Sequence, residues 1–182
     1  MPPKRKTGRN RPRDAGGIAA RRDATQLTAR KARDENAWEL VLPRCAVQRM
    51  EDLQEVRSIL DAGEHEVAVD ELRWLLGGCS DMLDAHKMLG ELALLNNDLP
   101  LARGHFGYAY QLGIKAIERA GARGTLPFRL PANQPFFEAG KGLVHCLREL
   151  GRDQLAREAV EQLLKLDPSD PLGIGELLPR GG

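Results

Sequence analysis

Apolar residues recur at helical spacing through most of the chain from residue 36 onward. The segment of residues 47–62 is a clear example, because its apolar side chains fall three or four positions apart and so share one face of a helix. The same spacing returns in five later segments. We therefore predict six helices: residues 47–62, residues 64–76, a cap at Ser80 or Asp81 through residue 95, residues 99–118, an opening at Asn133 and Pro135 through residue 150, and residues 153–166.

Turn-forming residues separate these segments and group them into pairs. Gly63 and Gly151 each stand between two apolar segments, and residues 96–98 form a similar break in the middle of the chain. Asp98 is a typical N-cap residue, and Pro100 falls in the first turn of the next helix, where proline is tolerated. Because none of these segments shows the alternating pattern of a strand, the pattern predicts helix pairs and no β-sheet.

The composition agrees with an all-α fold of one domain. Leucine and alanine supply 49 of the 182 residues, whereas valine and isoleucine supply only 12 and aromatic residues 4%. Good helix formers thus outnumber the residues that favour strands. The mean hydropathy is −0.41, and no apolar run approaches the roughly 18–20 residues of a membrane helix. We therefore expect a soluble protein with no membrane partner.

The net charge of +1 conceals two oppositely charged parts. Residues 1–34 carry 11 lysines and arginines against three aspartates, a net charge of +8, while the rest of the chain has a net charge of −7. Residues 1–34 hold few large apolar side chains and cannot bury enough surface to offset the entropy of ordering them. We expect a disordered basic arm over residues 1–34, with a transient amphipathic helix within residues 18–33, followed by one helical domain over residues 35–182.

The three helix pairs align as an internal repeat. Ala68, Ala102 and Ala156 each follow a turn residue by five positions, and a large apolar residue stands four positions after each alanine. The first two alanines are 34 residues apart, and the third follows after a further 34 residues and an insertion of 20. The alignment gives repeats at about residues 49–82, 83–116 and 137–170, with the insertion at about residues 117–136.

This 34-residue pattern resembles the tetratricopeptide repeat (TPR). The resemblance spans residues 49–168, and His86 and Gly140 stand where the family has tryptophan. It implies antiparallel helix pairs stacked as a short right-handed superhelix, for which three repeats are about the minimum. The middle unit carries the resemblance best, with Ala85-His86, Leu89-Gly90, Ala93, Asn97-Asp98, Ala102, Phe106 and Ala109.

Members of the TPR family usually bind peptides or protein surfaces in a concave groove lined by the first helix of each pair. The resemblance therefore implies that another protein or peptide binds this chain. The main implied groove residues are Lys87, Met88, Glu91, Leu94, Lys141, His145 and Arg148, and further positions include Met50, Arg57, Asp84, Glu138 and Gly142. No groove position holds asparagine, so we do not expect the two-carboxylate clamp of chaperone-binding members.

Patterns typical of catalysis or metal binding are absent from the sequence. Cys45, Cys79 and Cys146 are odd in number and far apart, which predicts reduced thiols in a cytoplasmic protein. The histidines are scattered, and the neighbours His145 and Cys146 point about 100° apart on a helix, so they do not form a nucleophile–base pair. We predict no enzymatic activity, no cofactor and no metal site.

The insertion has a pattern of its own. Leu126, Phe128 and Leu130 alternate with prolines and an arginine, which predicts an extended segment with one apolar side. Two interpretations stay open. The insertion is either a packed strap over the joint between the second and third repeats, or an element that binds the partner or closes the groove, with Phe128 over a bound peptide.

The sequence thus favours a non-catalytic adaptor or scaffold. The leading alternative is a nucleic-acid- or ribosome-associated factor, although the arm has no aromatic residue to stack on bases and the remaining chain is acidic. A small subunit of an enzyme with a separate catalytic chain is a third alternative, and an arm folded onto a second copy would give a homo-oligomer. The arm residues expected to bind polyanions are Lys4, Arg5, Lys6, Arg9, Arg11 and Arg13.

Overall fold

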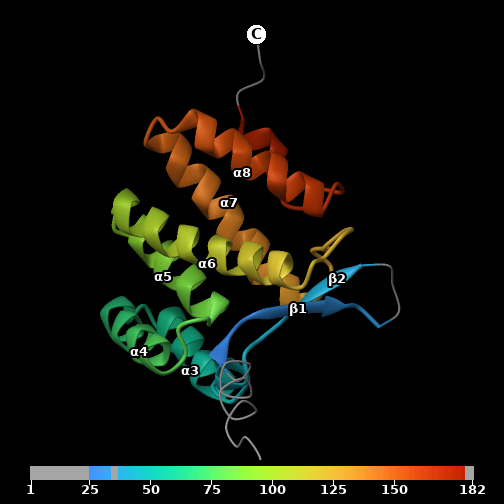
Figure 1. Ribbon diagram of the computed structural model, residues 1–182. Helices are drawn as coiled ribbons and strands as arrows, with labels where there is room; N and C mark the ends of the chain where they lie inside the picture. Colours follow the sequence, from blue (N-terminus) through green and yellow to red (C-terminus); the bar gives the residue numbers. More distant parts are fainter. Residues whose placement is uncertain (1–24, 34–36, 179–182) are drawn as a thin grey trace, which may run out of the picture.

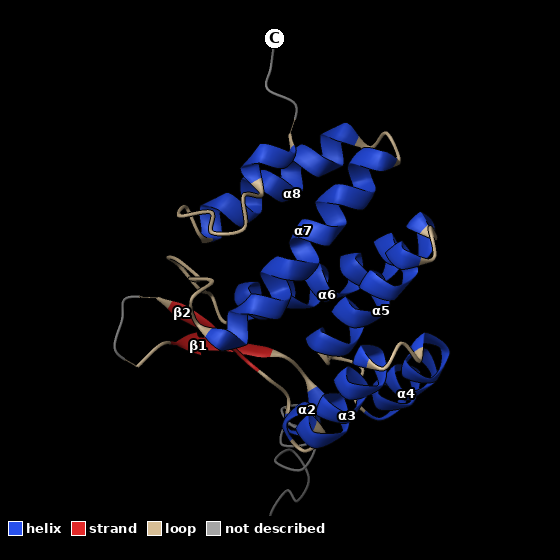
Figure 2. Cartoon of the chain, turned by 180° about the vertical axis from the view of Figure 1, so that it is seen from behind, coloured by secondary structure: helices blue, strands red, loops and turns tan. Residues whose placement is uncertain are grey.

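The computed structural model describes residues 25–33 and 37–178, and most of these residues are helical. The helices follow one another along the molecule, with a small two-stranded sheet against one side (Figure 1), and Figure 2 shows the same arrangement from behind. The elements are β1 (Thr28–Lys31), β2 (Trp38–Val41), α2 (Arg44–Val47), α3 (Met50–Asp61), α4 (His65–Gly78), α5 (Leu83–Leu95), α6 (Leu99–Arg119), the 3₁₀ turn η1 (Pro131–Asn133), α7 (Gln134–Glu149), α8 (Asp153–Leu166) and the 3₁₀ turn η2 (Gly175–Leu177).

The six predicted helices correspond to α3 through α8, which confirms a mainly α-helical fold. They pack as three successive pairs, α3 with α4, α5 with α6, and α7 with α8. Asp98 caps α6 as predicted, because its carboxylate accepts a hydrogen bond from the N–H of Leu101 (3.0 Å). Among the described residues, no helix is both long enough and apolar enough to cross a membrane.

One turn geometry closes all three pairs. Gly63, Asn97 and Gly151 have positive φ angles of 81°, 57° and 67°. Each donates its N–H to the carbonyl three residues earlier, and the following residue donates to the carbonyl five residues earlier, over 2.7–3.1 Å. This is the Schellman motif, which favours glycine or asparagine at its left-handed position. The structure therefore repeats the turn at the positions that the sequence alignment brought together.

Small residues allow the helices to approach one another. Ala68, Ala102 and Ala156 are fully buried. Phe106 on α6 lies between α5 and α7, where a Cβ atom added to Gly90 would come within 2.6 Å of its ring, and one added to Gly142 within 2.7 Å. Helices α5, α6 and α7 therefore interlock around one aromatic side chain.

The buried apolar side chains form two clusters that share α5. The first cluster lies among α2, α3, α4 and α5, and the second among α5 to α8 and the strands. Helix α5 contributes Met88 and Leu89 to the first cluster, and Leu83 and Ala93 to the second. The stack is continuous because one helix belongs to both cores.

Strands β1 and β2 show that the prediction of no sheet was wrong. They pair antiparallel, with Ala29 opposite Leu40 and Lys31 opposite Trp38. Leu27 and Leu40 are buried and belong to the second cluster. Each strand has only four residues, so each offers two inward positions and leaves little alternation for the sequence to show.

The predicted arm of residues 1–34 is wrong at its end, because residues 25–33 pack against the helices. The N–H of Leu27 donates to Asp81 Oδ2 (2.9 Å), and its carbonyl accepts from Arg119 (3.1 Å). The helix expected within residues 18–33 is also wrong for the four residues that form β1. The disorder expected for residues 1–24 lies outside the described residues, as do Lys4, Arg5, Lys6, Arg9, Arg11 and Arg13.

The insertion is a packed strap between the sheet and α8. Leu126 is 1% exposed, and its N–H donates to the last carbonyl of α8 (2.8 Å). The buried Asn133 links the strap to β2. Its Oδ1 accepts from the N–H of Leu40 (2.8 Å), and its Nδ2 donates to the carbonyls of Trp38 (3.2 Å) and Pro127 (2.9 Å). One amide side chain thus fastens the sheet to the strap.

A disulfide bond joins Cys45 in α2 to Cys79, the residue after α4. The prediction of three reduced cysteines is therefore wrong for this pair, although Cys146 is a buried free thiol. The two bonded residues are 34 positions apart in the sequence, but their Cα atoms are 5.6 Å apart. Their separation in the sequence concealed this contact, which depends on the chain returning through α3 and α4.

Candidate functional site

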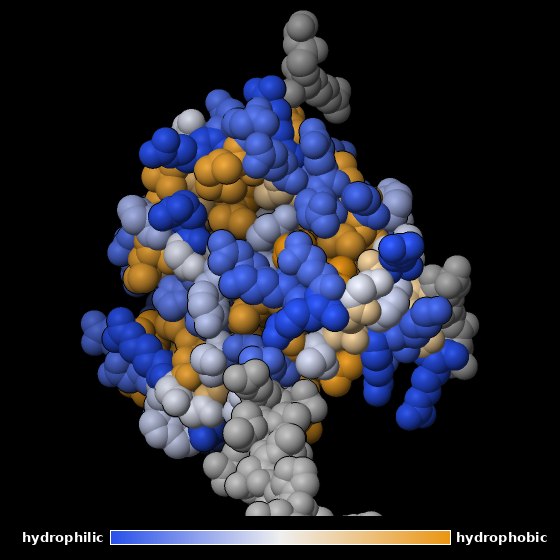
Figure 3. Space-filling model, viewed as in Figure 1, coloured by the Kyte–Doolittle hydropathy of each residue, from blue (hydrophilic) through white to orange (hydrophobic). Residues whose placement is uncertain are grey.

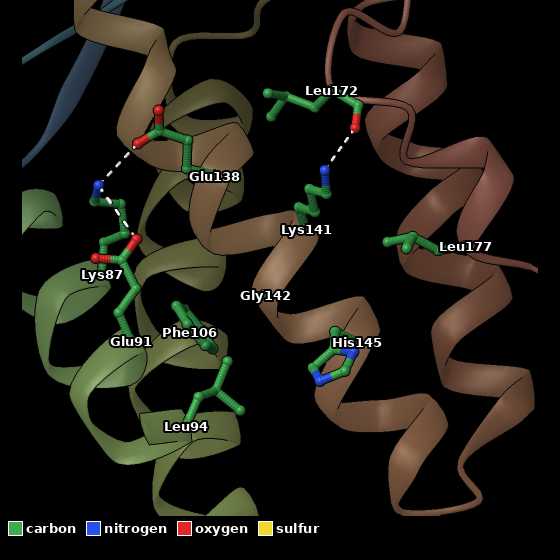
Figure 4. Close-up of a pocket in the computed structure, with 10 residues that line it drawn as sticks. All are labelled: Lys87, Glu91, Leu94, Phe106, Glu138, Lys141, Gly142, His145, Leu172 and Leu177. Atoms are coloured by element: carbon green, nitrogen blue, oxygen red, sulfur yellow. Dashed lines mark hydrogen bonds and ion pairs between the residues drawn. The ribbon is translucent and has the colours of Figure 1, made fainter. Parts of the chain in front are cut away.

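A cavity of about 450 Å³ opens between α5, α7 and the C-terminal segment, which we define as residues 171–178 (Figure 4). The first helices of the second and third pairs both line it, as the repeat alignment implied. The lining residues are Lys87, Glu91, Leu94, Phe106, Glu138, Lys141, Gly142, His145, Leu172 and Leu177.

A second cavity of about 490 Å³ lies next to the first, on the side of α3. Met50 and Arg57 of α3 and Asp84 of α5 line it, and Lys87 and Glu138 line both cavities. The first helix of every pair therefore contributes to one surface. We call the two cavities together the groove.

An ion-pair cluster lies between the two parts of the groove. Lys87 Nζ is 3.1 Å from Glu138 Oε2 on α7 and 3.4 Å from Glu91 Oε1 one turn along α5. Burial alone would lower the pKa of Lys87, but Glu91 and Glu138 raise it above its usual value. Lys87 is therefore a permanent cation whose charge the protein already balances with two carboxylates.

A second ion pair connects α3 to α5 at the floor of the groove. Arg57 is 3.1 Å from Asp84 Oδ1. Burial raises the pKa of Asp84, while Arg57 and Lys87 act in the opposite direction. This part of the groove is also balanced in charge.

Lys141 differs from the other cations of the groove. Its Nζ donates to the main-chain carbonyl of Leu172 (2.8 Å), and no carboxylate of the described residues lies within ion-pair distance. His145 follows one turn later on the same face of α7 and is exposed. The α7 side of the groove therefore presents a positive charge that no acidic side chain of the described part offsets.

Most of the implied groove residues meet at this cavity. Lys87, Glu91, Leu94, Lys141 and His145 line it, but Met88 and Arg148 do not. Met88 is 5% exposed in the first cluster, because it follows Lys87 and so points about 100° away around the helix. Arg148 is half-buried outside both cavities.

The C-terminal segment is the wall that sequence reasoning missed. Asp170 holds it by accepting hydrogen bonds from the N–H groups of Ile174 (2.7 Å) and Gly175 (2.9 Å), and Ile174 is buried. Leu172 and Leu177 then face the cavity. The apolar residues Leu172, Ile174 and Leu177 indicate that this tail packs, but the sequence does not show against which helix.

Phe128 of the insertion does not face the groove, although Pro131, Ala132 and Pro135 of the same insertion line the second cavity. Phe128 packs edge-on against Phe137 at 6.2 Å between ring centroids, and its N–H donates to Asp167 Oδ2 (2.7 Å). It lines neither cavity of the groove. Phe128 therefore acts in the packed strap, and the interpretation of this residue as a cover for a bound peptide is wrong for this conformation.

Two histidines that are scattered in the sequence meet in the fold. Nδ1 of His86 on α5 lies 3.3 Å from Nδ1 of His105 on α6, and Nε2 of His86 is 3.0 Å from the carbonyl of Ser80. No third ligand completes a metal site here or elsewhere in the described ranges. The contact is a helix-to-helix hydrogen bond rather than a metal centre.

No family model, no curated protein and no solved structure matches the chain.

Proposed function

We propose that this protein is a non-catalytic adaptor of the tetratricopeptide-repeat type, which binds a peptide or surface segment of another protein in the groove. The observation that carries the proposal is the convergence of first-helix side chains from all three pairs on two adjacent cavities, which share Lys87 and Glu138. The Schellman turns at equivalent positions of the three pairs support an internal repeat. No cofactor or metal is part of the proposal.

The chemistry of the groove favours an acidic segment with an apolar side chain. Lys141 donates to a neutral carbonyl, and a partner's carboxylate would exchange this bond for a charge-assisted one. Leu94, Phe106 and Leu177 offer an apolar surface beside it. The carboxylate of such a segment would bind Lys141, and its apolar side chain would pack on the apolar surface of the same cavity.

The compartment is a separate part of the proposal. We keep a cytoplasmic location as proposed, but the argument from reduced cysteines no longer supports it, because Cys45 and Cys79 are bonded. Thiol alkylation in intact cells before lysis tests it. A Cys45–Cys79 pair that resists alkylation in cells would place the protein in an oxidising compartment instead.

Site-specific photo-crosslinking tests the groove. A photo-reactive amino acid at position 94 reports on the groove, and one at position 155, an exposed leucine of α8, is the matched control. We expect a partner crosslinked at position 94 and lost in Lys141→Glu, with an unchanged melting temperature. Crosslinking of the same partner at position 155, or retention of it in Lys141→Glu, would show that another surface binds.

A further inference from the structure

The sheet and the insertion form one surface beside the helices. The N–H of Trp38 donates to the carbonyl of Thr125 (2.8 Å), and its indole Nε1 donates to the carbonyl of Arg123 (3.1 Å). A parallel bridge between Ala37 and Thr125 continues this contact. We call residues 25–33, 37–42 and 119–135 together the platform.

The described residues of the platform are mostly basic where they are charged. Among them the only acidic residue is Glu39, whose carboxylate already pairs with Arg30 (2.7 Å), while Asp34 and Glu35 follow Arg33 in the sequence outside the described residues. In the view of Figure 3, which matches that of Figure 1, hydrophilic side chains project from the end of the hairpin. The basic residues of the platform are Arg30, Lys31, Arg33, Arg119, Arg123 and Arg129.

Three of these cations are exposed and have no ion pair within the described part of the chain: Lys31, Arg33 and Arg123. Surface cations that are not balanced by nearby carboxylates attract polyanions, and they release counterions when they bind phosphates. The contrast with residues 50–72 is sharp, because that segment carries eight acidic side chains and one basic one. Within the described residues, the platform is therefore the surface that attracts a nucleic-acid backbone.

An aromatic ring lies among these cations. Trp38 is half-buried, its strand partner is Lys31, and its indole is fixed by the main chain of Arg123. Proteins that bind single-stranded nucleic acid combine a basic track for the backbone with aromatic rings on which bases stack. Trp38 supplies the stacking residue that residues 1–34 lack.

We infer that the platform is a binding site for single-stranded nucleic acid, with Lys31, Arg33 and Arg123 on the phosphates and Trp38 against a base. This inference does not depend on the groove or its partner. Residues 1–24 precede the platform in the chain and carry eight basic residues against two acidic ones.

The fluorescence of Trp38 gives a direct test in the full-length chain. The variant Trp74→Phe removes the other tryptophan, which is exposed and lies outside the platform. We expect a single-stranded oligonucleotide to quench Trp38 at saturation. Unchanged Trp38 fluorescence in the bound complex would overturn the stacking contact and with it the inference.

Charge variants test the backbone contacts. The triple variant Lys31→Ala, Arg33→Ala, Arg123→Ala is compared with a control triple of exposed residues on α6 and α8, Arg103→Ala, Arg157→Ala, Lys165→Ala. We expect the platform triple to weaken binding at least about tenfold and to lower the log–log salt slope by about 2, since each single-strand phosphate contact adds about 0.7. An equal loss in the control triple, or a platform loss below twofold, would overturn the inference.

Polyglutamate separates nucleic acid from an acidic protein segment. It offers negative charge without bases, so we expect weaker binding and no quenching of Trp38. Equal affinity with equal quenching would show that an acidic polypeptide is the ligand, and it would overturn the assignment to nucleic acid.

Discussion

The α3–α4 pair and the contact of α6 with α7, which joins the second helix pair to the third, are held in the same stack in two different ways. The first pair packs through aliphatic side chains such as Leu53 and Leu72, and a disulfide fastens the end of α4 to α2. In the second, aromatic rings fill positions that only glycine leaves open, with Phe106 against Gly142 and Phe136 against Gly113. The first pair depends on buried area and a covalent bond, whereas the second depends on shape.

This difference predicts that a destabilising substitution in the α3–α4 pair affects that pair alone, whereas one in α6 also destabilises α5 and α7. Phe106→Ala removes a ring that contacts α5 and α7, and we expect a loss of about 3–5 kcal/mol in the free energy of unfolding. Leu72→Ala occupies the equivalent position in the first pair and should cost about 2–5 kcal/mol. Urea unfolding measures the loss in the free energy of unfolding, and hydrogen exchange shows which helices lose protection. Loss of protection confined to α6 in Phe106→Ala would contradict the interlocked arrangement.

Removing the disulfide tests the covalent attachment. The double variant Cys45→Ser, Cys79→Ser should lower stability by about 2–4 kcal/mol, because the unfolded chain regains the entropy of a closed loop. We expect hydrogen exchange to rise in α3 and α4 and to stay unchanged in α6 and α7. The matched control is Cys146→Ser, whose thiol is buried in the second cluster and which should affect α6 and α7 instead. Similar exchange patterns in the two variants would show that the pairs are not independent.

Enlarging the buried alanines compares the α3–α4 and α5–α6 pairs at one repeat position. Ala68→Leu and Ala102→Leu each place a large side chain at a site that is 0% exposed, and overpacking should cost about 1–3 kcal/mol. We expect the larger loss at Ala102, since Phe106 and its neighbours leave α6 little freedom to shift. The exposed Gln111→Leu is the control. Unchanged melting temperatures in both variants would contradict the repeat alignment that places Ala68 and Ala102 at equivalent positions.

The smallest expected effect is a loss of stability at acidic pH through His86 and His105. Burial lowers the pKa of both below the usual 6.5, and the ring of His105 beside His86, and Arg73 beside His105, act in the same direction. The unfolded chain therefore binds more protons as pH falls below about 6.5, so stability is complete above that pH and declines below it.

Chemical denaturation between pH 7.5 and 5 checks this dependence. His105→Gln should flatten the profile, because it removes one of the two shifted groups and the repulsion on the other. His145→Gln on the exposed side of α7 is the control and should keep the wild-type slope. A profile that His105→Gln leaves unchanged would assign the acid sensitivity to other residues.

Local features of the fold were predictable, and contacts between distant segments were not. Helix α8 has the predicted bounds, residues 153–166, and the cap at Asp98 is present, because both depend on residues within a few positions. The contact of the sheet with the insertion joins residues 85 positions apart, and the disulfide joins residues 34 positions apart. Trp38 reaches Arg123, and Cys45 reaches Cys79, through the fold of everything between them.

The groove shows the same division. Lys87 and Lys141 were placed correctly because the repeat alignment fixes which face of each helix they occupy. Met88 was misplaced, since an error of one position turns a side chain about 100° into the core. Leu172 and Leu177 could not be found in this way, because the C-terminal segment belongs to no repeat unit.

The hydrogen bonds of Asn133 restrict which residues evolution can place at position 133. Its buried amide accepts one hydrogen bond and donates two. Aspartate at this position would direct an oxygen at two carbonyl oxygens, while leucine would leave three polar groups unpaired. Sequence drift at Ala132 and Gln134 meets no such restriction. Among diverged descendants of this sequence that keep the sheet on the strap, position 133 should therefore read asparagine while its neighbours vary, and descendants with another residue there should have lost the sheet.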